Sequence, residues 1–234
     1  MFTIRLAELN IRINNKYEYV KNLCADYIII GRPHFYIEVT DAEIEAERQL
    51  AKNDIGYLEA LAIYRKIAEK IVEYDGFLMH GAVISVNDCG IAFLAKSGTG
   101  KTTHINLWSK LLRNKVIIIN GDKPLLRIIG GKIYAYGTPW AGKEGLNRNT
   151  KTELKNICFL SRGLVNECFC VTDRDLILEK LFTQTYLPKN PHGLKNTLGF
   201  LKIIMDKCRF YSVKCNTDIG AAEIAYKAIL LFRK

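Results

Sequence analysis

The pattern of apolar and polar positions changes near residue 54. Before it, residues 2–39 run or alternate apolar in short stretches such as "FTIRLAELNIRI" and "FYIEV", which is typical of strands. After it, residues 54–73 place their apolar side chains on one stripe of a helix. We therefore expect a small β-rich region over residues 1–53 and a second domain over residues 54–234.

From residue 77 onward, short apolar runs alternate with helical stretches. Two apolar runs flank Gly130 and Gly131, which predicts a hairpin with a two-residue turn. The expected strands are 77–86, 91–95, 115–120, the hairpin 125–136, 154–160, 166–171 and 210–215. The expected helices are 102–112, 173–186, 194–208 and 219–232. This alternation predicts an α/β domain in which helices flank the sheet.

The stretch "FLAKSGTGKTTHINLW" joins an expected strand to an expected helix. Residues Ala95–Thr102 match the P-loop pattern with alanine in place of the first glycine. Glycines let successive backbone N–H groups face one point, and the helix N-terminus adds partial positive charge, so such a loop cradles phosphates. The competing interpretation is a relic loop that no longer binds nucleotide. The residues expected to hold nucleotide are Ser97, Gly98, Thr99, Gly100, Lys101, Thr102 and Thr103.

A P-loop also needs a carboxylate for its metal ion on a nearby strand. Asp122 follows the apolar run "VIIIN", and from such a strand end it can hold Mg²⁺ together with the hydroxyl of Thr102. Lys101 can reach the β- and γ-phosphates. The competing interpretation of Asp122 is a turn-forming residue before Lys-Pro.

The segments "HGAVISVNDCGIAFLAKSGTGKT" and "NGDKP" together resemble the catalytic domain of HPr kinase/phosphorylase. The P-loop itself is also similar to that of ATP-dependent phosphoenolpyruvate carboxykinase. The resemblance extends over residues 55–230 and is specific over 78–145. It implies a small HPr-kinase-related protein whose mixed β-sheet core contains a P-loop, which uses ATP and Mg²⁺, and in which His80, Lys101 and Asp122 are catalytic.

One position departs from that family. Two adjacent acids stand at this strand end in HPr kinases, where they divide metal binding and hydroxyl activation, but here the first is Gly121. Either Asp122 serves both roles, or His80 takes the proton, or catalysis has decayed. A histidine at a strand end can also be purely structural, and we leave His104, in the helix after the loop, outside the chemistry.

A second glycine-rich segment, "YGTPWAGKEGLNRN", follows the expected hairpin. Lys143 and Arg148 offer charge that can pair with phosphate, and Trp140 lies between glycines that make such a loop mobile. We expect these three residues to form a lid over nucleotide or acceptor. The alternative is an ordinary basic surface loop.

Charge and cysteine content narrow the partners. Residues 1–75 carry 10 basic and 13 acidic side chains, while residues 76–234 carry 24 and 11, so the excess positive charge of this +10 chain lies with the P-loop region. A basic surface attracts anions such as nucleotides, whereas no nucleic-acid-binding motif is present. The seven scattered cysteines favour a reducing, cytoplasmic setting. We expect neither a membrane span nor a signal peptide, and the family resemblance allows a homo-oligomer.

Together these observations predict an ATP-dependent kinase. It would transfer a γ-phosphoryl group to a hydroxyl of a protein or peptide serine or of a small alcohol, because phosphoryl transfer needs chiefly positioning and charge neutralisation. The alternative is a regulatory nucleotide-binding module, a pseudokinase with weak or no transfer activity, which Gly121 favours.

Overall fold

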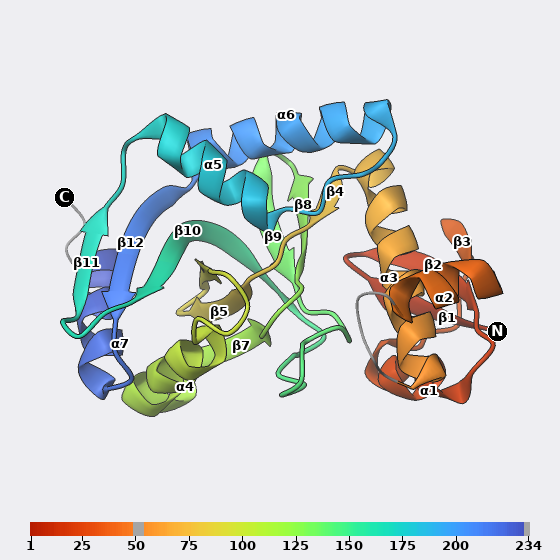
Figure 1. The fold of residues 1–234 in the computed structure, drawn as a ribbon, viewed down its shortest axis with the longest axis horizontal. Coiled ribbons are helices and arrows are strands. Elements are labelled where there is room, and N and C mark those ends of the chain that lie inside the picture. Colours follow the sequence, from red (N-terminus) through yellow and green to blue (C-terminus); the bar gives the residue numbers. More distant parts are fainter. Residues whose placement is uncertain (49–53, 232–234) are drawn as a thin grey trace. The chain divides into compact units, whose positions relative to one another are not determined.

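Helix α3 (Ile55–Lys70) belongs to the first of two compact units into which the chain divides, residues 1–74 and 75–234 (Figure 1). The computed structural model describes residues 1–48 and 54–231. The division lies later in the chain than the boundary expected after residue 53. The reason is that α3 packs against the other helices and the sheet of the first unit.

The first unit combines a three-stranded sheet with helices. In chain order its elements are β1 (Phe2–Leu6), β2 (Leu9–Asn14), α1 (Glu18–Leu23), η1 (Ala25–Tyr27), β3 (Phe35–Glu38), α2 (Asp41–Arg48), α3 and η2 (Ile71–Tyr74). Strand β2 is central, antiparallel to β1 and parallel to β3. The strands expected from "FTIRLAELNIRI" and "FYIEV" are therefore present. The apolar run "YIII" (27–30), which also predicts a strand, is not one, because Tyr27 ends η1 and only an isolated bridge joins Ile28 to Ile4. Helices α1 and α2 were not predicted by the apolar pattern.

A buried carboxylate connects α3 to the start of α1. Glu59 is fully buried and accepts hydrogen bonds from the backbone N–H groups of Lys16 and Tyr17. Because these donors satisfy the carboxylate, its burial does not leave an unpaired charge in the interior. Apolar side chains such as Ile11 and Ile63 fill the rest of this core.

The second unit contains the long α/β part of the chain. Its strands are β4 (Gly76–Leu78), β5 (Ala82–Val86), β6 (Cys89–Leu94), β7 (Val116–Asn120), β8 (Leu125–Ile129), β9 (Lys132–Tyr136), β10 (Lys151–Arg162), β11 (Glu167–Cys170) and β12 (Arg209–Cys215). Its helices are α4 (Lys101–Leu112), α5 (Arg174–Gln184), α6 (Pro191–Lys207) and α7 (Ile219–Tyr226), with the short η3 (Arg113–Lys115) and the π-helix η4 (Lys227–Leu231).

These strands form one mixed, curled sheet. Its order is β4-β8-β9-β10-β6-β5-β7, with β12 beside β10 and β11 beside β12. The long strand β10 is antiparallel to β9 near its start and parallel to β6 and β12 farther on. Strands β6 and β10 therefore end at the same edge of the sheet, where the glycine-rich loop begins.

Helices cover both faces of this sheet (Figure 1). Helices α4 and α7 pack together on one face over a core that includes Ile91, Phe93 and the fully buried Trp108. Helices α5 and α6 lie on the other face, where Phe200 of α6 stacks on Phe77 of β4 with ring centroids 5.7 Å apart. The predicted α/β class with a mixed sheet and flanking helices therefore describes this unit.

Most expected elements of the second unit appear with shifted ends. The expected strand 77–86 is interrupted at Met79–Gly81, because His80 and Gly81 donate backbone hydrogen bonds to Gln184 and Asp122 instead of extending a ladder. The expected hairpin is β8–β9, and Gly130 and Gly131 have φ of 57° and 74° in its turn. The expected last helix is split into α7 and η4.

Two further observations concern expectations from composition. Within residues 1–48 and 54–231, no helix has the length and apolar character required to cross a bilayer. All seven cysteines are free thiols, and Cys24, Cys89, Cys158 and Cys208 are buried.

Candidate active site

The glycine-rich loop leads from the end of β6 into α4. Gly98 and Gly100 have φ of 78° and 117°, a backbone conformation that favours glycine. Added Cβ atoms would meet open space at both positions, so conformation rather than crowding calls for glycine. Ser97 and Thr103 are exposed, and Thr102 lies half-buried in the first turn of α4.

Lys101, the first residue of α4, turns its ammonium group back toward the loop. Its Nζ donates to the carbonyl oxygen of Ala95 at 2.9 Å and lies 3.2 Å from Nε2 of His80. Burial lowers the pKa of Lys101, Asp122 opposes this shift, and Lys123 adds to it. The site therefore holds a desolvated cation that donates to one neutral group, the carbonyl oxygen of Ala95.

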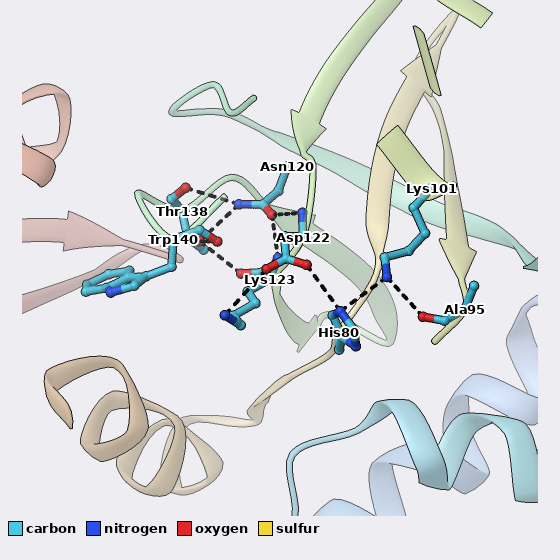
Figure 2. Close-up of polar contacts among 8 residues, drawn as sticks. All are labelled: His80, Ala95, Lys101, Asn120, Asp122, Lys123, Thr138 and Trp140. Carbon is cyan, nitrogen blue, oxygen red and sulfur yellow. Dashed lines mark hydrogen bonds and ion pairs between the residues drawn. The ribbon is translucent and has the colours of Figure 1, made fainter. Parts of the chain in front are cut away.

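Asp122 is the next member of this chain of contacts. Its Oδ1 lies 3.1 Å from Nε2 of His80, and its Oδ2 lies 3.4 Å from Nζ of Lys123 (Figure 2). Burial by itself raises the pKa of Asp122, but the hydrogen bond from His80 and the charges of Lys123 and Lys101 outweigh it and lower that pKa. Asp122 is therefore held as a carboxylate, the form that binds metal ions and accepts protons.

A buried amide shapes the turn that carries Asp122. Asn120, the last residue of β7, is fully buried, and its Oδ1 accepts from the backbone N–H groups of Asp122 (2.8 Å) and Lys123 (2.7 Å). Its Nδ2 donates to the carbonyl and hydroxyl oxygens of Thr138, also fully buried. Thr138 in turn donates to the carbonyl of Lys123. Figure 2 shows this network beside the carboxylate.

Gly121 sits within the same turn, pressed against the following loop. Its N–H donates to the carbonyl of Leu146 at 2.8 Å. A Cβ atom added here would lie 3.3 Å from Cβ and O of Leu146 and 3.4 Å from O of Ala141. A side chain at this position would start between two carbonyl oxygens.

The loop after β9 differs from the expected mobile lid. Trp140 is buried, with 5% of its surface exposed, and Figure 2 shows its indole directed away from Asp122 and His80. The backbone of Arg148 donates to Ile119 of β7, which anchors the end of the loop. Lys143 and Arg148 are exposed. The exposed part of the loop is therefore residues 142–145 with Arg148 and Asn149, whereas Trp140 is covered.

Two residues that the sequence did not single out contact the glycine-rich loop. Arg162, the last residue of β10, donates from Nε to the carbonyl of Thr99 (3.2 Å) and from Nη2 to that of Gly98. Gln184, at the end of α5, accepts on its backbone carbonyl oxygen from the backbone N–H of His80 at 2.7 Å, and its side-chain amide lies against the carbonyl oxygen of Ala95 in the loop. Neither residue belongs to a recognisable motif, and only the fold brings them to the loop.

A cavity of about 350 Å³ opens beside the loop. It is lined by Thr99, Gly100, Thr103, His104, Arg162, Gly163, Cys215, Asn216 and Thr217. His104 is buried there, and its Nε2 accepts from Nε1 of Trp108 at 3.0 Å. A larger cavity, about 600 Å³, lies where β6 and β10 begin, and none of the predicted site residues lines it.

A magnesium site of the kind expected for nucleotide enzymes fits these residues. Across residues 1–48 and 54–231 there is no cluster of three or more His, Cys, Asp or Glu side chains that could hold a metal ion. Mg²⁺ in phosphoryl-transfer sites needs fewer protein ligands, commonly one or two carboxylates with substrate phosphates and water. In such a site Asp122, held as a carboxylate, and Thr102, in the first turn of α4, would be the protein oxygen donors.

Comparison with solved structures yields distant structural likenesses. No family model and no curated protein matches the chain. Among solved structures, the HPr(Ser) kinase/phosphatase from Coxiella burnetii matches with a TM-score of 0.37 and 9% identity, covering 67% of this chain and 95% of that chain. Because this likeness is slight, the function proposed below is based on the side chains of the site.

Proposed function

We propose that the chain is an ATP-dependent kinase that transfers the γ-phosphoryl group of Mg·ATP to a hydroxyl group. The observation that carries the proposal is the contact chain Lys101–His80–Asp122, with neighbouring atoms 3.2 and 3.1 Å apart. A cation for phosphate and a carboxylate for metal or proton thereby meet at the N-terminus of one helix. These are the groups that phosphoryl transfer requires.

The glycine-rich loop supports the phosphate part of this proposal. At the start of α4, free N–H groups and the helix dipole favour an anion. Arg162 binds the carbonyl oxygens of Gly98 and Thr99, so the N–H of Gly100, on the opposite side of the second peptide, can face phosphate. The N–H of Thr99 donates within the loop, to the carbonyl oxygen of Lys96 at 3.2 Å. The buried ammonium of Lys101 gains a charged partner when phosphate arrives.

The cavity beside the loop supports the nucleoside part. It adjoins Thr99, Gly100 and Thr103, and its hydroxyl, amide and guanidinium groups can hydrogen-bond to a sugar or a base edge. Its volume lies at the lower end of the range for small-molecule sites. We therefore propose that the nucleoside of ATP lies there.

The chemical step assigns Asp122 two tasks. With Thr102 it would hold Mg²⁺, which supplies charge neutralisation on the phosphates when bound. In the transfer, the acceptor oxygen forms a bond to the γ-phosphorus, the bond from that phosphorus to the β–γ bridging oxygen breaks, and ADP leaves. The proton of the hydroxyl passes to the Asp122 carboxylate. The acceptor is a serine of a protein or peptide, or a small alcohol.

The alternative is a regulatory module that binds nucleotide with little or no transfer. Gly121 favours it, because the first of the two adjacent acids of the related kinases is missing and its place faces carbonyl oxygens. Both functions share nucleotide binding and differ only in turnover.

Calorimetry and turnover test the proposal in order. Lys101→Ala should weaken Mg·ATP binding at least tenfold, about 1.4 kcal/mol, whereas Lys110→Ala, on the exposed last turn of α4, should not. Asp122→Asn should keep the fold but abolish transfer of labelled γ-phosphate to hydroxyl acceptors. Equal ATP affinity in wild type and Lys101→Ala would refute the phosphate site. If the chain binds Mg·ATP but transfers phosphate to no acceptor, the regulatory module is the function that fits.

A further inference from the structure

Gln184 places its side-chain amide against both His80 and the glycine-rich loop. When the amide nitrogen faces this cluster, it lies 3.1 Å from the carbonyl oxygen of Ala95, 3.2 Å from Nδ1 of His80 and 3.2 Å from the carbonyl oxygen of His80. Two carbonyl oxygens and a ring nitrogen thus surround one NH₂ group. The reverse orientation would put the amide oxygen against two carbonyl oxygens.

Two hydrogen-bond arrangements can be compared around His80. In the first, Nδ1 carries the proton and donates to the Gln184 oxygen, while the bare Nε2 accepts from Lys101. That arrangement sets the Gln184 oxygen against two carbonyl oxygens, and the bare Nε2 against the Asp122 carboxylate at 3.1 Å. It therefore contains three repulsive contacts.

In the second arrangement, the Gln184 nitrogen donates to Nδ1 and to the carbonyl oxygens. The proton is then on Nε2, where it donates to Oδ1 of Asp122. Its one unfavourable contact lies between Nε2 and Nζ of Lys101, and the ammonium still donates to Ala95 at 2.9 Å. This arrangement satisfies more of these half-buried polar groups, which decides between the two.

We infer that Gln184 is a positioning residue that fixes His80 as the Nε2–H tautomer, with its proton directed at Asp122. Neither ring nitrogen can then take the proton of a substrate hydroxyl, because Nδ1 is occupied by Gln184 and Nε2 already carries hydrogen. His80 acts as a hydrogen-bond donor that holds the Asp122 carboxylate. The catalytic meaning of this inference rests on the proposed function, whereas the tautomer itself does not.

The chain provides an internal reference for measuring this tautomer. His104 accepts on Nε2 from the indole N–H of Trp108, a group that can only donate, so its proton must be on Nδ1. His80 and His104 should therefore be opposite tautomers in the same molecule. With four histidines in the sequence, single His→Gln variants assign every signal.

The test is long-range ¹H–¹⁵N correlation NMR on the full chain labelled at histidine, without nucleotide, at pH 8, above the ordinary histidine pKa of about 6.5. Wild type should show His80 with bare Nδ1 and protonated Nε2, the reverse of His104. Gln184→Glu, which can only accept, should move the proton of His80 to Nδ1, and Gln184→Met should give mixed tautomers. Glu179→Gln, exposed on the same helix, should change nothing. A wild-type His80 protonated on Nδ1, or an unchanged pattern in both Gln184 variants, overturns the inference.

A kinetic measurement separates this inference from the proposed function. Gln184→Met should lower the rate of phosphoryl transfer by about 10- to 100-fold, the usual effect of removing a partner that orients a site residue, with ATP affinity unchanged. Because the NMR needs no nucleotide, the predicted tautomer with no transfer in wild type would uphold the positioning role and refute the kinase. If wild type transfers phosphate but its His80 carries the proton on Nδ1, the kinase is upheld and the positioning role of Gln184 is refuted.

Discussion

At the residue scale, the main feature of the site is a charged group, the ammonium of Lys101, that lacks a full set of partners. The ammonium of Lys101 is buried against the carbonyl of Ala95 and the ring of His80, and burial lowers its pKa. A buried cation without a charged partner is unfavourable. Because the lysine is already desolvated in the free protein, a phosphate that binds there is attracted to the ammonium without any further desolvation of it. Lys101 therefore lowers the stability of the free protein and raises its affinity for phosphate.

His104 gives a prediction about the pH dependence of stability. Burial lowers its pKa to about 4, below the ordinary value near 6.5. As pH falls through 6.5, the unfolded chain gains a proton at this position and the folded chain does not, so the folded state loses about 1.4 kcal/mol per pH unit until pH approaches 4. His104→Gln retains an acceptor for Trp108 and removes this contribution.

Urea unfolding at pH 7.5 and 5.0 measures the effect. Wild type should lose about 2 kcal/mol more than His104→Gln between these two values. His192→Gln, at an exposed histidine of α6, should lose as much as wild type. Parallel losses in wild type and His104→Gln would mean that His104 is protonated in the folded state.

Gly121 gives a second prediction at this scale. The family resemblance suggests that an aspartate here would restore a second acid and raise turnover. The structure argues otherwise, because an added Cβ lies 3.3–3.4 Å from the carbonyl oxygens of Leu146 and Ala141. Gly121→Ala should therefore lower stability by about 1–3 kcal/mol through overpacking, and Gly121→Asp by more, since its carboxylate approaches the same oxygens. Turnover should not rise. Thermal unfolding and a transfer assay decide, and a stable, faster Gly121→Asp enzyme would contradict this account.

The residues of the site were only partly predictable. Lys101, His80 and Asp122 carry motif signals, and the structure places them in contact. Asn120 and Gln184 carry none, because their importance comes from burial and from acceptors supplied by other segments. For Asn120, the one hint in the sequence was its place as a polar residue at the end of the apolar run "VIIIN". The burial of Trp140 was not predictable, since an aromatic residue between glycines fits an exposed lid and a buried loop equally well.

At the scale of elements, periodicity predicted long segments better than short ones. Helix α3 and the hairpin β8–β9 occur where the pattern placed them, because many residues repeat the same preference. Helices α1 and α2 were missed, being too short for a helical stripe to stand out from alternation. The break at Met79–Gly81 was missed for another reason. It arises from backbone hydrogen bonds to Gln184 and Asp122, which are distant in sequence.

The turn from β7 to β8 yields a prediction about one element. Asn120 bonds the N–H groups of Asp122 and Lys123 and both oxygens of Thr138. Asn120→Ala leaves these groups unsatisfied, which should cost about 1–3 kcal/mol and displace the Asp122 carboxylate. Turnover should fall while ATP affinity, set by the glycine-rich loop, stays within a few-fold.

Chemical denaturation, calorimetry and a transfer assay on the same variant check this. Asn106→Ala, on the exposed side of α4, is the matched control and should change none of the three. Asn120→Asp keeps the accepting oxygen, so its stability and turnover should lie between those of Asn120→Ala and wild type. Loss of ATP binding equal to the loss of turnover would show that the turn supports the phosphate loop as well as the carboxylate.

At the scale of the whole molecule, the two units differ in charge. Residues 1–74 carry 10 basic and 12 acidic side chains, and residues 75–234 carry 24 and 12. The excess positive charge thus belongs to the unit that contains the glycine-rich loop. A positive surface raises the local concentration of an anion such as Mg·ATP, with an effect that declines as salt increases.

The division into two units leads to a prediction about thermal unfolding. Both tryptophans, Trp108 and Trp140, lie in residues 75–234, so intrinsic tryptophan fluorescence reports that unit, whereas far-ultraviolet circular dichroism reports both. Mg·ATP at 100 times its Kd should stabilise the fluorescent unit by about 2.7 kcal/mol, which raises its Tm by roughly 5–10 °C for a unit of this size.

Lys101→Ala, the control, should show little shift at the same concentration. If the dichroism transition moves with the fluorescence, the units unfold together, and if it splits, the unmoved part belongs to residues 1–74. A fluorescence transition that Mg·ATP leaves in place, or moves equally in Lys101→Ala, would show that nucleotide does not bind through this lysine.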